Sequence, residues 1–397
     1  MPGAPPAPVV TATTPPAARI VCTLFYKATT PRSPPPHPDA SPHRPTDTLS
    51  RATLESLAGG VVPTADLSQY PLEPPTPGPN PLDNLFGAYI SQSCLTDFLR
   101  TLDAVLPGYP EHTAVRRVLD SEQWPRVVEV AFGLPPSLAA APDAALQTLR
   151  QHETVSRFER EWNVEAIWQR ASVFRTHKRL AVFDMDSTLI QQEVIDEVAR
   201  HIGVEAQVSA ITAAAMNGEL DFEASLRKRC ALLAGVPVEV WENIRKLITP
   251  TPGAVDLVKA LKRLGYKTAV LSGGFTPVTG WFAQQLGLDY AFANHLVVSE
   301  DGKTLTGELT GEIVHAERKR QHVREIAEKE GILLEQVLVV GDGANDLPMM
   351  GVAGLGVAFN AKARVQMEAP ARLNSESLLN ILYLLGFSKA EQEELLR

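Results

Sequence analysis

The stretch RLAVFDMDST, residues 179–188, decides the fold. Its first five residues form a short apolar run typical of a buried strand, and Asp184 and Asp186 follow almost at once. Burying two carboxylates costs free energy unless a cation compensates, and hard divalent cations prefer oxygen ligands. We therefore expect a Mg²⁺ site at the end of this strand. Taken alone, the stretch is also compatible with a solvated acidic loop, because Asp is common in turns.

Three later runs have the same form, at residues 268–271 (TAVL), 337–340 (VLVV) and 355–359 (LGVAF). Helical stretches separate them, and alternating strands and helices predict a parallel sheet covered by helices on both faces. The expected fold class is thus α/β, with a Rossmann-like parallel core. Ligands of such sheets bind at the carboxyl ends of the strands, so the polar residues that follow these runs should converge.

Ser272-Gly273-Gly274 follows the second run. A hydroxyl beside adjacent backbone N–H groups can form a cradle for phosphate. Judged alone, this motif is better explained as an ordinary strand-to-helix turn.

The sequence GDGAND, residues 341–346, follows the third run. Asp342 and Asp346 can add metal ligands, and Asn345 can hold a ligand or a carboxylate. Asp346 stands where a G-x-G-x-x-G motif needs its last glycine, which disfavours a dinucleotide site. The alternative is a glycine-rich turn capped by Asp.

Lys319 lies within the basic cluster ERKR, residues 317–320. A lysine near a transferring phosphoryl group offsets its charge. A basic cluster on a helix is more often a solvated face, and spacing does not choose Lys319 over Arg318 or Arg320. The four motifs follow one another in the order acid, hydroxyl, base and acid. This order favours phosphoryl transfer over the structural explanation given for each motif alone.

Between the first two runs lies a helical insert, at about residues 193–246, in which Ile195, Val198 and Ala199 recur at helical spacing. It is long enough to form a small cap over the strand ends. A hairpin is expected at about residues 296–309, turned by Asp301-Gly302.

The pieces VFDMDSTLI, LDFEASLRKR, LSGGF, YAFAN and VGDGANDLPMM resemble the phosphoserine phosphatases of the haloacid dehalogenase superfamily, over about residues 178–385. The resemblance implies hydrolysis of O-phospho-L-serine, the last step of L-serine biosynthesis, through an aspartyl-phosphate on Asp184. Asp186 would be the general acid and base. Mg²⁺ would be bound by Asp184, the backbone carbonyl of Asp186, and Asp342.

The same resemblance implies a set of substrate-binding residues. The phosphoryl group would be held by Ser272, Gly273 and Lys319, with Asn345 and Asp346 in support. In the cap, Glu193 would pair with the substrate ammonium, Arg229 with its carboxylate, and Phe222 would help to close the site. Without the resemblance, Phe222 would be assigned to the core and Glu193 to a helix N-terminus.

The N-terminal half follows a different pattern. Thirteen of the 32 prolines lie within residues 2–45 and seven within residues 63–81, a composition that resists packing. A strand is expected at residues 19–27, a helix at 95–105, a strand at 126–132 and a helix at 153–171. The two strands are hypothesised to share one degenerate regulatory module. The expected domains are a Pro-rich extension (1–82), an accessory α/β region (83–175), a catalytic core (176–192 and 247–397) and the helical cap (193–246).

Composition excludes several classes of protein. The net charge is −9 and no basic stripe is present, which argues against nucleic-acid binding. The three cysteines, Cys22, Cys94 and Cys230, lack C-x-x-C spacing, which argues against a zinc site and favours a reducing compartment. No apolar run reaches the length of about 18 residues that a membrane span needs. A cytoplasmic location is expected, with a mitochondrial transit peptide as the alternative for the Thr- and Pro-rich start. The sequence does not determine an oligomeric state.

Two other functions compete with phosphoserine hydrolysis. One is a phosphatase or phosphotransferase for another small phosphomonoester. Glu193 and Arg229 discriminate between the two, since a sugar phosphate offers neither an ammonium nor a carboxylate. The other is a phosphorylation-dependent regulatory protein, since signalling receivers also combine an acidic pocket with a lysine. A receiver needs neither a helical cap nor Asp186 as a leaving-group acid.

Overall fold

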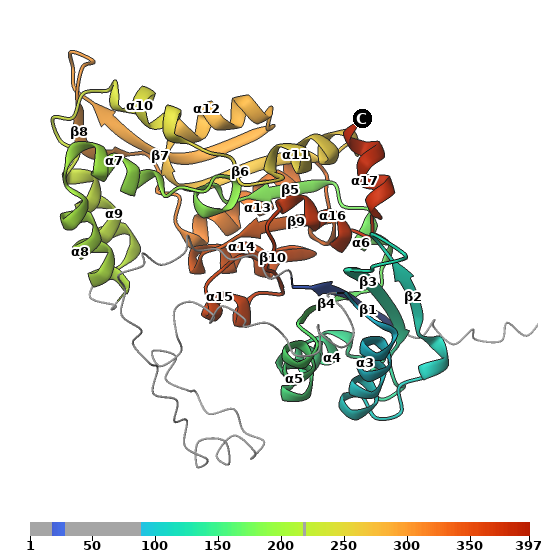
Figure 1. Ribbon diagram of the computed structural model, residues 1–397. Coiled ribbons are helices and arrows are strands. Elements are labelled where there is room, and N and C mark those ends of the chain that lie inside the picture. Colours follow the sequence, from blue (N-terminus) through green and yellow to red (C-terminus); the bar gives the residue numbers. More distant parts are fainter. Residues whose placement is uncertain (1–17, 28–88, 217–219) are drawn as a thin grey trace, which may run out of the picture.

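The computed structural model describes residues 18–27, 89–216 and 220–397, so most of the Pro-rich extension lies outside the described residues (Figure 1). The larger of its two sheets has the order β11-β10-β9-β5-β6-β7-β8, and only the β7–β8 pair is antiparallel. This confirms the expected parallel core. The strands of this sheet are β5 (Leu180–Phe183), β6 (Lys267–Phe275), β7 (Tyr290–Val298), β8 (Leu305–Thr310), β9 (Val337–Gly341), β10 (Leu355–Phe359) and β11 (Ala371–Leu373).

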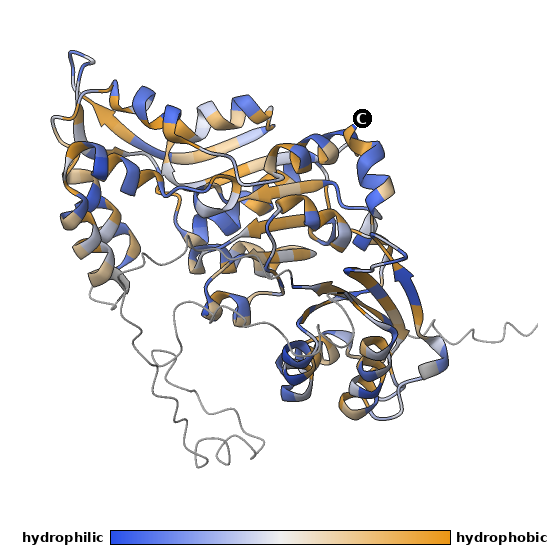
Figure 2. Ribbon diagram, viewed as in Figure 1, coloured by the Kyte–Doolittle hydropathy of each residue, from blue (hydrophilic) through white to orange (hydrophobic). Residues whose placement is uncertain are grey.

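Helices cover both faces of the large sheet, and alternate residues of each strand point to opposite faces. In β5, Phe183 packs in one apolar cluster with Leu257 of α11, while Val182 packs in another with Val323 of α13. The central strands β5 and β9 are accordingly almost entirely apolar (Figure 2). The helices of the core are α6 (Val173–Thr176), α11 (Ala254–Arg263), α12 (Thr276–Leu286), α13 (Ala316–Lys329), α14 (Leu347–Val352), α15 (Ala363–Glu368), α16 (Ile381–Leu384) and α17 (Lys389–Leu396).

The insert between β5 and β6 is helical, as expected. Ile195, Val198 and Ala199 are buried along one face of its first helix. The cap also joins the β7–β8 hairpin, because Gly235 N–H donates to Leu305 O at 2.8 Å. Its helices are α7 (Val194–Ile202), α8 (Glu205–Met216), α9 (Phe222–Ala231) and α10 (Val240–Leu247).

The smaller sheet is antiparallel, with the order β2-β3-β1-β4. β1 pairs with β3, as the hypothesis of a shared module requires. Three helices cover one face, where Leu24 and Phe98 share an apolar cluster. The other face packs against the catalytic core, and the Phe25 ring meets the Tyr383 ring edge-on at 6.0 Å. The elements are β1 (Arg19–Tyr26), β2 (Val115–Val118), β3 (Val127–Gly133), β4 (Val164–Arg170), α3 (Gln92–Val105), α4 (Pro142–Gln151) and α5 (Glu153–Glu161).

The expected helix at residues 153–171 is wrong in its second half. α5 ends at Glu161, and Asn163 adopts a left-handed conformation (φ 49°) that ends the helical turn. The following residues form β4, in which Trp168 lies opposite Cys22 of β1. A strand partner from far upstream therefore overrides the local helical pattern.

Five single turns complete the described secondary structure. A π-type turn, η3 (Met185–Leu189), follows β5 directly. The four 3₁₀ turns are η2 (Glu111–Thr113), η4 (Leu334–Gln336), η5 (Ala344–Asp346) and η6 (Leu378–Asn380). No helix within the described ranges has both the length and the hydrophobicity that crossing a membrane requires.

Candidate active site

The acidic, hydroxyl and glycine-rich motifs lie at the carboxyl ends of β5, β6 and β9 respectively, three adjacent strands in the middle of the large sheet. The pairing extends past the end of β5, because Asp184 N–H donates to Val340 O at 2.9 Å. Adjacent parallel strands end at the same edge of a sheet, so motifs far apart in the chain come together here.

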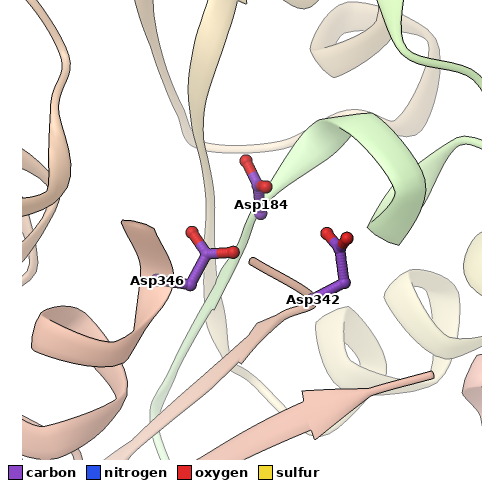
Figure 3. A group of neighbouring side chains, drawn as sticks. All are labelled: Asp184, Asp342 and Asp346. Carbon is purple, nitrogen blue, oxygen red and sulfur yellow. The ribbon is translucent and has the colours of Figure 1, made fainter. Parts of the chain in front are cut away.

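Three carboxylates, those of Asp184, Asp342 and Asp346, converge at this edge (Figure 3). One oxygen atom of each lies within 4.8 Å of the others. Asp184 and Asp346 are buried, and Asp342 is partly buried. Clustered carboxylate oxygens are the ligands that a hard divalent cation prefers. The arrangement therefore fits a divalent cation.

Lys319 brings a positive charge to this cluster from α13. Its fully buried Nζ donates to Asp184 Oδ1 at 2.7 Å and to Asp346 Oδ1 at 2.8 Å. The second oxygen of Asp346, Oδ2, accepts from Gly343 N–H at 3.0 Å. Because both oxygens of Asp346 are engaged, this residue is better suited to holding Lys319 than to binding a metal.

The structure separates Lys319 from the neighbouring arginines, which spacing did not. Arg318 pairs with Glu325 at 2.6 Å, and Arg320 pairs with Glu317 at 2.6 Å. Of the three cations in this cluster, Lys319 alone contacts the carboxylates at the strand ends.

Burial and crowding of like charges perturb the acids of the site. Burial raises the pKa of Asp184 well above its ordinary value, and the nearby charge of Asp346 adds to the effect. For the same two reasons the pKa of Asp342 rises to about 7. Burial alone would lower the pKa of Lys319, but the charges of Asp184 and Asp346 outweigh burial and raise it. The site thus holds more negative charge than Lys319 compensates, which a divalent cation would correct.

Asp186 lies on the turn that follows Asp184 and faces the phosphate-cradle motif. Its Oδ2 accepts from Val194 N–H, at the start of the first cap helix, at 3.1 Å. Its Oδ1 is buried and has no hydrogen-bond partner among the described residues. A Cβ added to Gly274 would lie 3.4 Å from Oδ2. Burial raises the pKa of Asp186, and the charge of Glu193 raises it further, so this carboxyl is poised to carry a proton.

The serine-glycine motif, Ser272–Gly274, lies within the last residues of β6, where the pairing with β7 shifts register. A side-chain hydrogen bond closes a local turn there, which we call the serine-glycine turn. Ser272 is fully buried, and its Oγ accepts from Gly274 N–H at 2.9 Å. The hydroxyl proton of Ser272 is therefore available for another acceptor. The Phe222 ring of the cap lies 3.5 Å from the position that a Cβ on Gly273 would occupy, so the cap closes over this turn.

The two charged cap residues lie on different cap segments. Glu193 precedes α7, and its Oε1 accepts from Ser187 Oγ at 2.6 Å. Arg229 lies on α9, and its Nε donates to Ser225 O at 3.4 Å. Burial lowers the pKa of Arg229, while the charges of Asp196 and Glu193 act in the opposite direction. The two side chains thus act on each other electrostatically across the underside of the cap.

The glycine-rich turn after β9 brings Asn345 and Asp346 back over the end of that strand. A Cβ on Gly343 would clash with the Asn345 side chain, and one on Gly341 would clash with Asp346. The two glycines are therefore needed for close approach of these side chains.

Sequence reasoning missed three residues that orient the site. Thr188 Oγ1 donates to Asp342 Oδ1 at 3.0 Å. Ser187 has a left-handed backbone (φ 56°), and its hydroxyl donates to Glu193 Oε1. Asn294 is buried and bonds both to the serine-glycine turn and to the segment before α13. Its one sequence signal is a polar residue late in the strand YAFAN, close to the edge where the other motifs end.

Comparisons with known proteins agree with this architecture. A family model described as haloacid dehalogenase-like hydrolase matches residues 178–354. A probable phosphoserine phosphatase of Schizosaccharomyces pombe is 48% identical over 62% of this chain and 82% of its own length. The phosphoserine phosphatase of Streptomyces coelicolor is 51% identical over 56% of this chain and 54% of its own length.

A solved structure extends the likeness beyond the catalytic core. A probable phosphoserine phosphatase from Vibrio cholerae is 32% identical, with a TM-score of 0.53, and covers 77% of this chain and 86% of its own. The long match to the fission-yeast protein, together with this fold, shows that the chain belongs to the phosphoserine phosphatase family of haloacid dehalogenase-like hydrolases.

Proposed function

We propose that the Asp184 carboxylate attacks phosphorus of O-phospho-L-serine, so that the bond to the serine oxygen breaks and an aspartyl-phosphate forms. Asp186 gives its proton to the departing serine oxygen and then takes a proton from the water that hydrolyses the intermediate. The products are L-serine and phosphate, as in the last step of L-serine biosynthesis. The observation that carries this proposal is the pair of perturbed carboxyls, one held by Lys319 and one with an unpartnered oxygen. Family membership supports the same reaction.

The phosphoryl group is proposed to lie between Lys319 and the serine-glycine turn. Lys319 and the hydroxyl of Ser272 donate to its oxygens, and the N–H of Gly273 adds a third donor. Asn345 supports the substrate from the facing turn. Mg²⁺, held by Asp184, the Asp186 carbonyl and Asp342, would offset charge on the transferring group.

Selection of the amino-acid part is assigned to the cap. Glu193 has a carboxylate for the substrate ammonium, and Arg229 has a planar fork that matches a carboxylate. Phe222, which already lies against Gly273, excludes water from the reacting centre.

The division into extension, accessory region, core and cap also remains a proposal, as does the cytoplasmic location. β1 belongs in the accessory module rather than the extension, since it pairs with both β3 and β4. The module shares an apolar cluster with the core, which supports a structural role for it.

The direct test is phosphate release from a panel of phosphomonoesters, with Mg²⁺ and with EDTA. We expect O-phospho-L-serine to be the preferred substrate and EDTA to abolish release. Faster turnover of a sugar phosphate would refute the assignment of Glu193 and Arg229, because such a substrate offers neither an ammonium nor a carboxylate.

A further inference from the structure

Asn294 lies in β7 at a position that bridges two parts of the phosphate site. It is 1% exposed, and it lies opposite Phe275 where the pairing of β6 with β7 shifts register. A fully enclosed carboxamide must satisfy both its donor and its acceptor, because an unpaired buried polar group costs free energy.

Both ends of this carboxamide are used. Nδ2 donates to Gly273 O at 2.8 Å, and Oδ1 accepts from Val314 N–H at 2.8 Å. The partners fix the orientation of the amide, since a carbonyl can only accept and a backbone N–H can only donate. Asn294 thus ties the serine-glycine turn to the segment that leads into α13 and Lys319.

The first of these bonds acts on a single peptide unit. The carbonyl of Gly273 and the N–H of Gly274 belong to the same planar peptide, so fixing one fixes the other. That N–H donates to Ser272 Oγ at 2.9 Å. Because Ser272 Oγ accepts this hydrogen bond, its own hydroxyl proton points away from Gly274 and can be donated to another group.

We propose that Asn294 is a positioning residue that orients the Gly273–Gly274 peptide, and through it the Ser272 hydroxyl, toward the phosphoryl group. The second bond holds the segment carrying Lys319 at a fixed distance from that hydroxyl. The proposal rests on the proposed function of this site. Asn suits the position because an ionised Asp supplies no donor for Gly273 O, and a residue such as Leu supplies neither group.

The test compares Asn294→Ala and the size-matched Asn294→Asp in the full-length enzyme with Mg²⁺. The probes are orthovanadate, an analogue of the phosphoryl transition state, and L-serine, which reports on the cap. Misplacing a catalytic group by about 1 Å costs roughly 10²-fold. We therefore expect kcat and orthovanadate affinity to fall by about 10²-fold, with KM and the inhibition constant of L-serine within about twofold.

Thr268→Val is the matched control. Thr268 is fully buried in the neighbouring strand β6, and its hydroxyl donates to Asp289 Oδ2 at 2.9 Å, at the end remote from the serine-glycine turn. This variant should melt at a lower temperature but keep kcat and orthovanadate affinity.

Three outcomes would overturn the proposal: unchanged orthovanadate affinity in the Asn294 variants, equal losses for orthovanadate and L-serine, or the same losses in Thr268→Val. Should Asn294→Ala fail to fold, Asn294→Asp decides by the same criteria. If the unsubstituted enzyme releases no phosphate from phosphoserine, the proposed function is refuted, but the proposal for Asn294 is not. The rise in melting temperature on adding orthovanadate, compared between the unsubstituted protein and the Asn294 variants, then tests that proposal.

Discussion

Lys319 and its two carboxylates set the chemistry of the site at the scale of single residues. The ammonium is fully buried, yet it is held by hydrogen bonds of 2.7 and 2.8 Å to Asp184 and Asp346. A buried cation is stable only when such partners compensate its lost hydration. One oxygen of Asp184, Oδ1, is thereby fixed by Lys319, and the proposed attack on phosphorus is assigned to the other oxygen.

Asp184→Asn should abolish turnover, because an amide is too weak a nucleophile to form the covalent intermediate. We expect kcat to fall by about 10⁴-fold or more, as when other catalytic nucleophiles are removed. Steady-state phosphate release measures the loss, and circular dichroism checks the fold. Asp301→Asn, on the exposed hairpin turn, is the control and should keep full activity. Substantial turnover by Asp184→Asn would reject the covalent mechanism.

The stability of the metal-free protein should fall as pH rises from about 4 to about 7. The folded pKa of Asp342, about 7, lies above the ordinary value of 3.8, so in this window the folded state binds more protons than the unfolded state. Stability contributed by the protonated carboxyl is present below this window and is lost across it. The loss should be roughly 2–4 kcal/mol.

Melting temperatures between pH 4 and pH 8, in EDTA and in saturating Mg²⁺, measure this effect. Mg²⁺ should flatten the profile, because it compensates the ionised carboxylate. Asp342→Asn should reduce the pH dependence in EDTA. Identical profiles with and without Mg²⁺ would count against a metal at this position.

At the scale of elements, α9 presents two arginines two positions apart with different surroundings. Arg227 is half exposed and pairs with Glu223 one helical turn earlier at 2.7 Å. Arg229 is partly buried on the underside of the cap and forms no ion pair with another residue in the described part of the chain. Helical periodicity therefore turns Arg227 toward solvent and Arg229 toward the underside of the cap.

Arg229→Ala should raise KM for O-phospho-L-serine by about 10- to 100-fold, the value of a hydrogen-bonded charge pair. O-phosphoethanolamine, which has the ammonium but no carboxylate, should be hydrolysed as before. Arg227→Ala is the matched control and should leave KM unchanged for both substrates. If Arg229→Ala left the ratio of the two substrates unchanged, the carboxylate would be recognised elsewhere.

At the scale of the whole molecule, the accessory module is joined to the core by buried ion pairs as well as apolar contacts. Arg372 of β11 pairs with Glu159 at 2.6 Å and with Glu165 at 3.1 Å. Arg175 pairs with Glu129 of β3 at 2.6 Å, and both side chains are almost fully buried. The module and the core should therefore unfold as one cooperative unit.

Arg372→Ala should lower the free energy of unfolding by about 3–5 kcal/mol, because it leaves two buried carboxylates without a counter-charge. Arg364→Ala, which removes an exposed pair with Glu368, should cost at most about 1 kcal/mol. Urea unfolding monitored by tryptophan fluorescence measures both. Equal effects of the two variants would show that the interface pair contributes no more than a surface pair.

Much of the catalytic core was predictable because its signals are local. Each short apolar run of the core appears as a strand, and the acids and small residues that follow mark the ends of those strands. The accessory module was less predictable: residues 164–170 continue a helical pattern in the sequence, yet they form β4 because β1 offers an unpaired edge. That pairing depends on a residue range more than a hundred positions away.

The sequence by itself determined the parallel core, the order of its motifs and the residues that resemble a phosphatase site, since these follow from periodicity and neighbouring residues. Spacing did not distinguish Lys319 from Arg318 or Arg320, and only the tertiary structure shows that Lys319 contacts the carboxylates while the two arginines pair elsewhere. Only the tertiary structure shows that Asn294 joins the serine-glycine turn to the segment before α13. Such choices depend on which side chains are buried together. Burial is a property of the packed molecule, and no spacing along the chain encodes it.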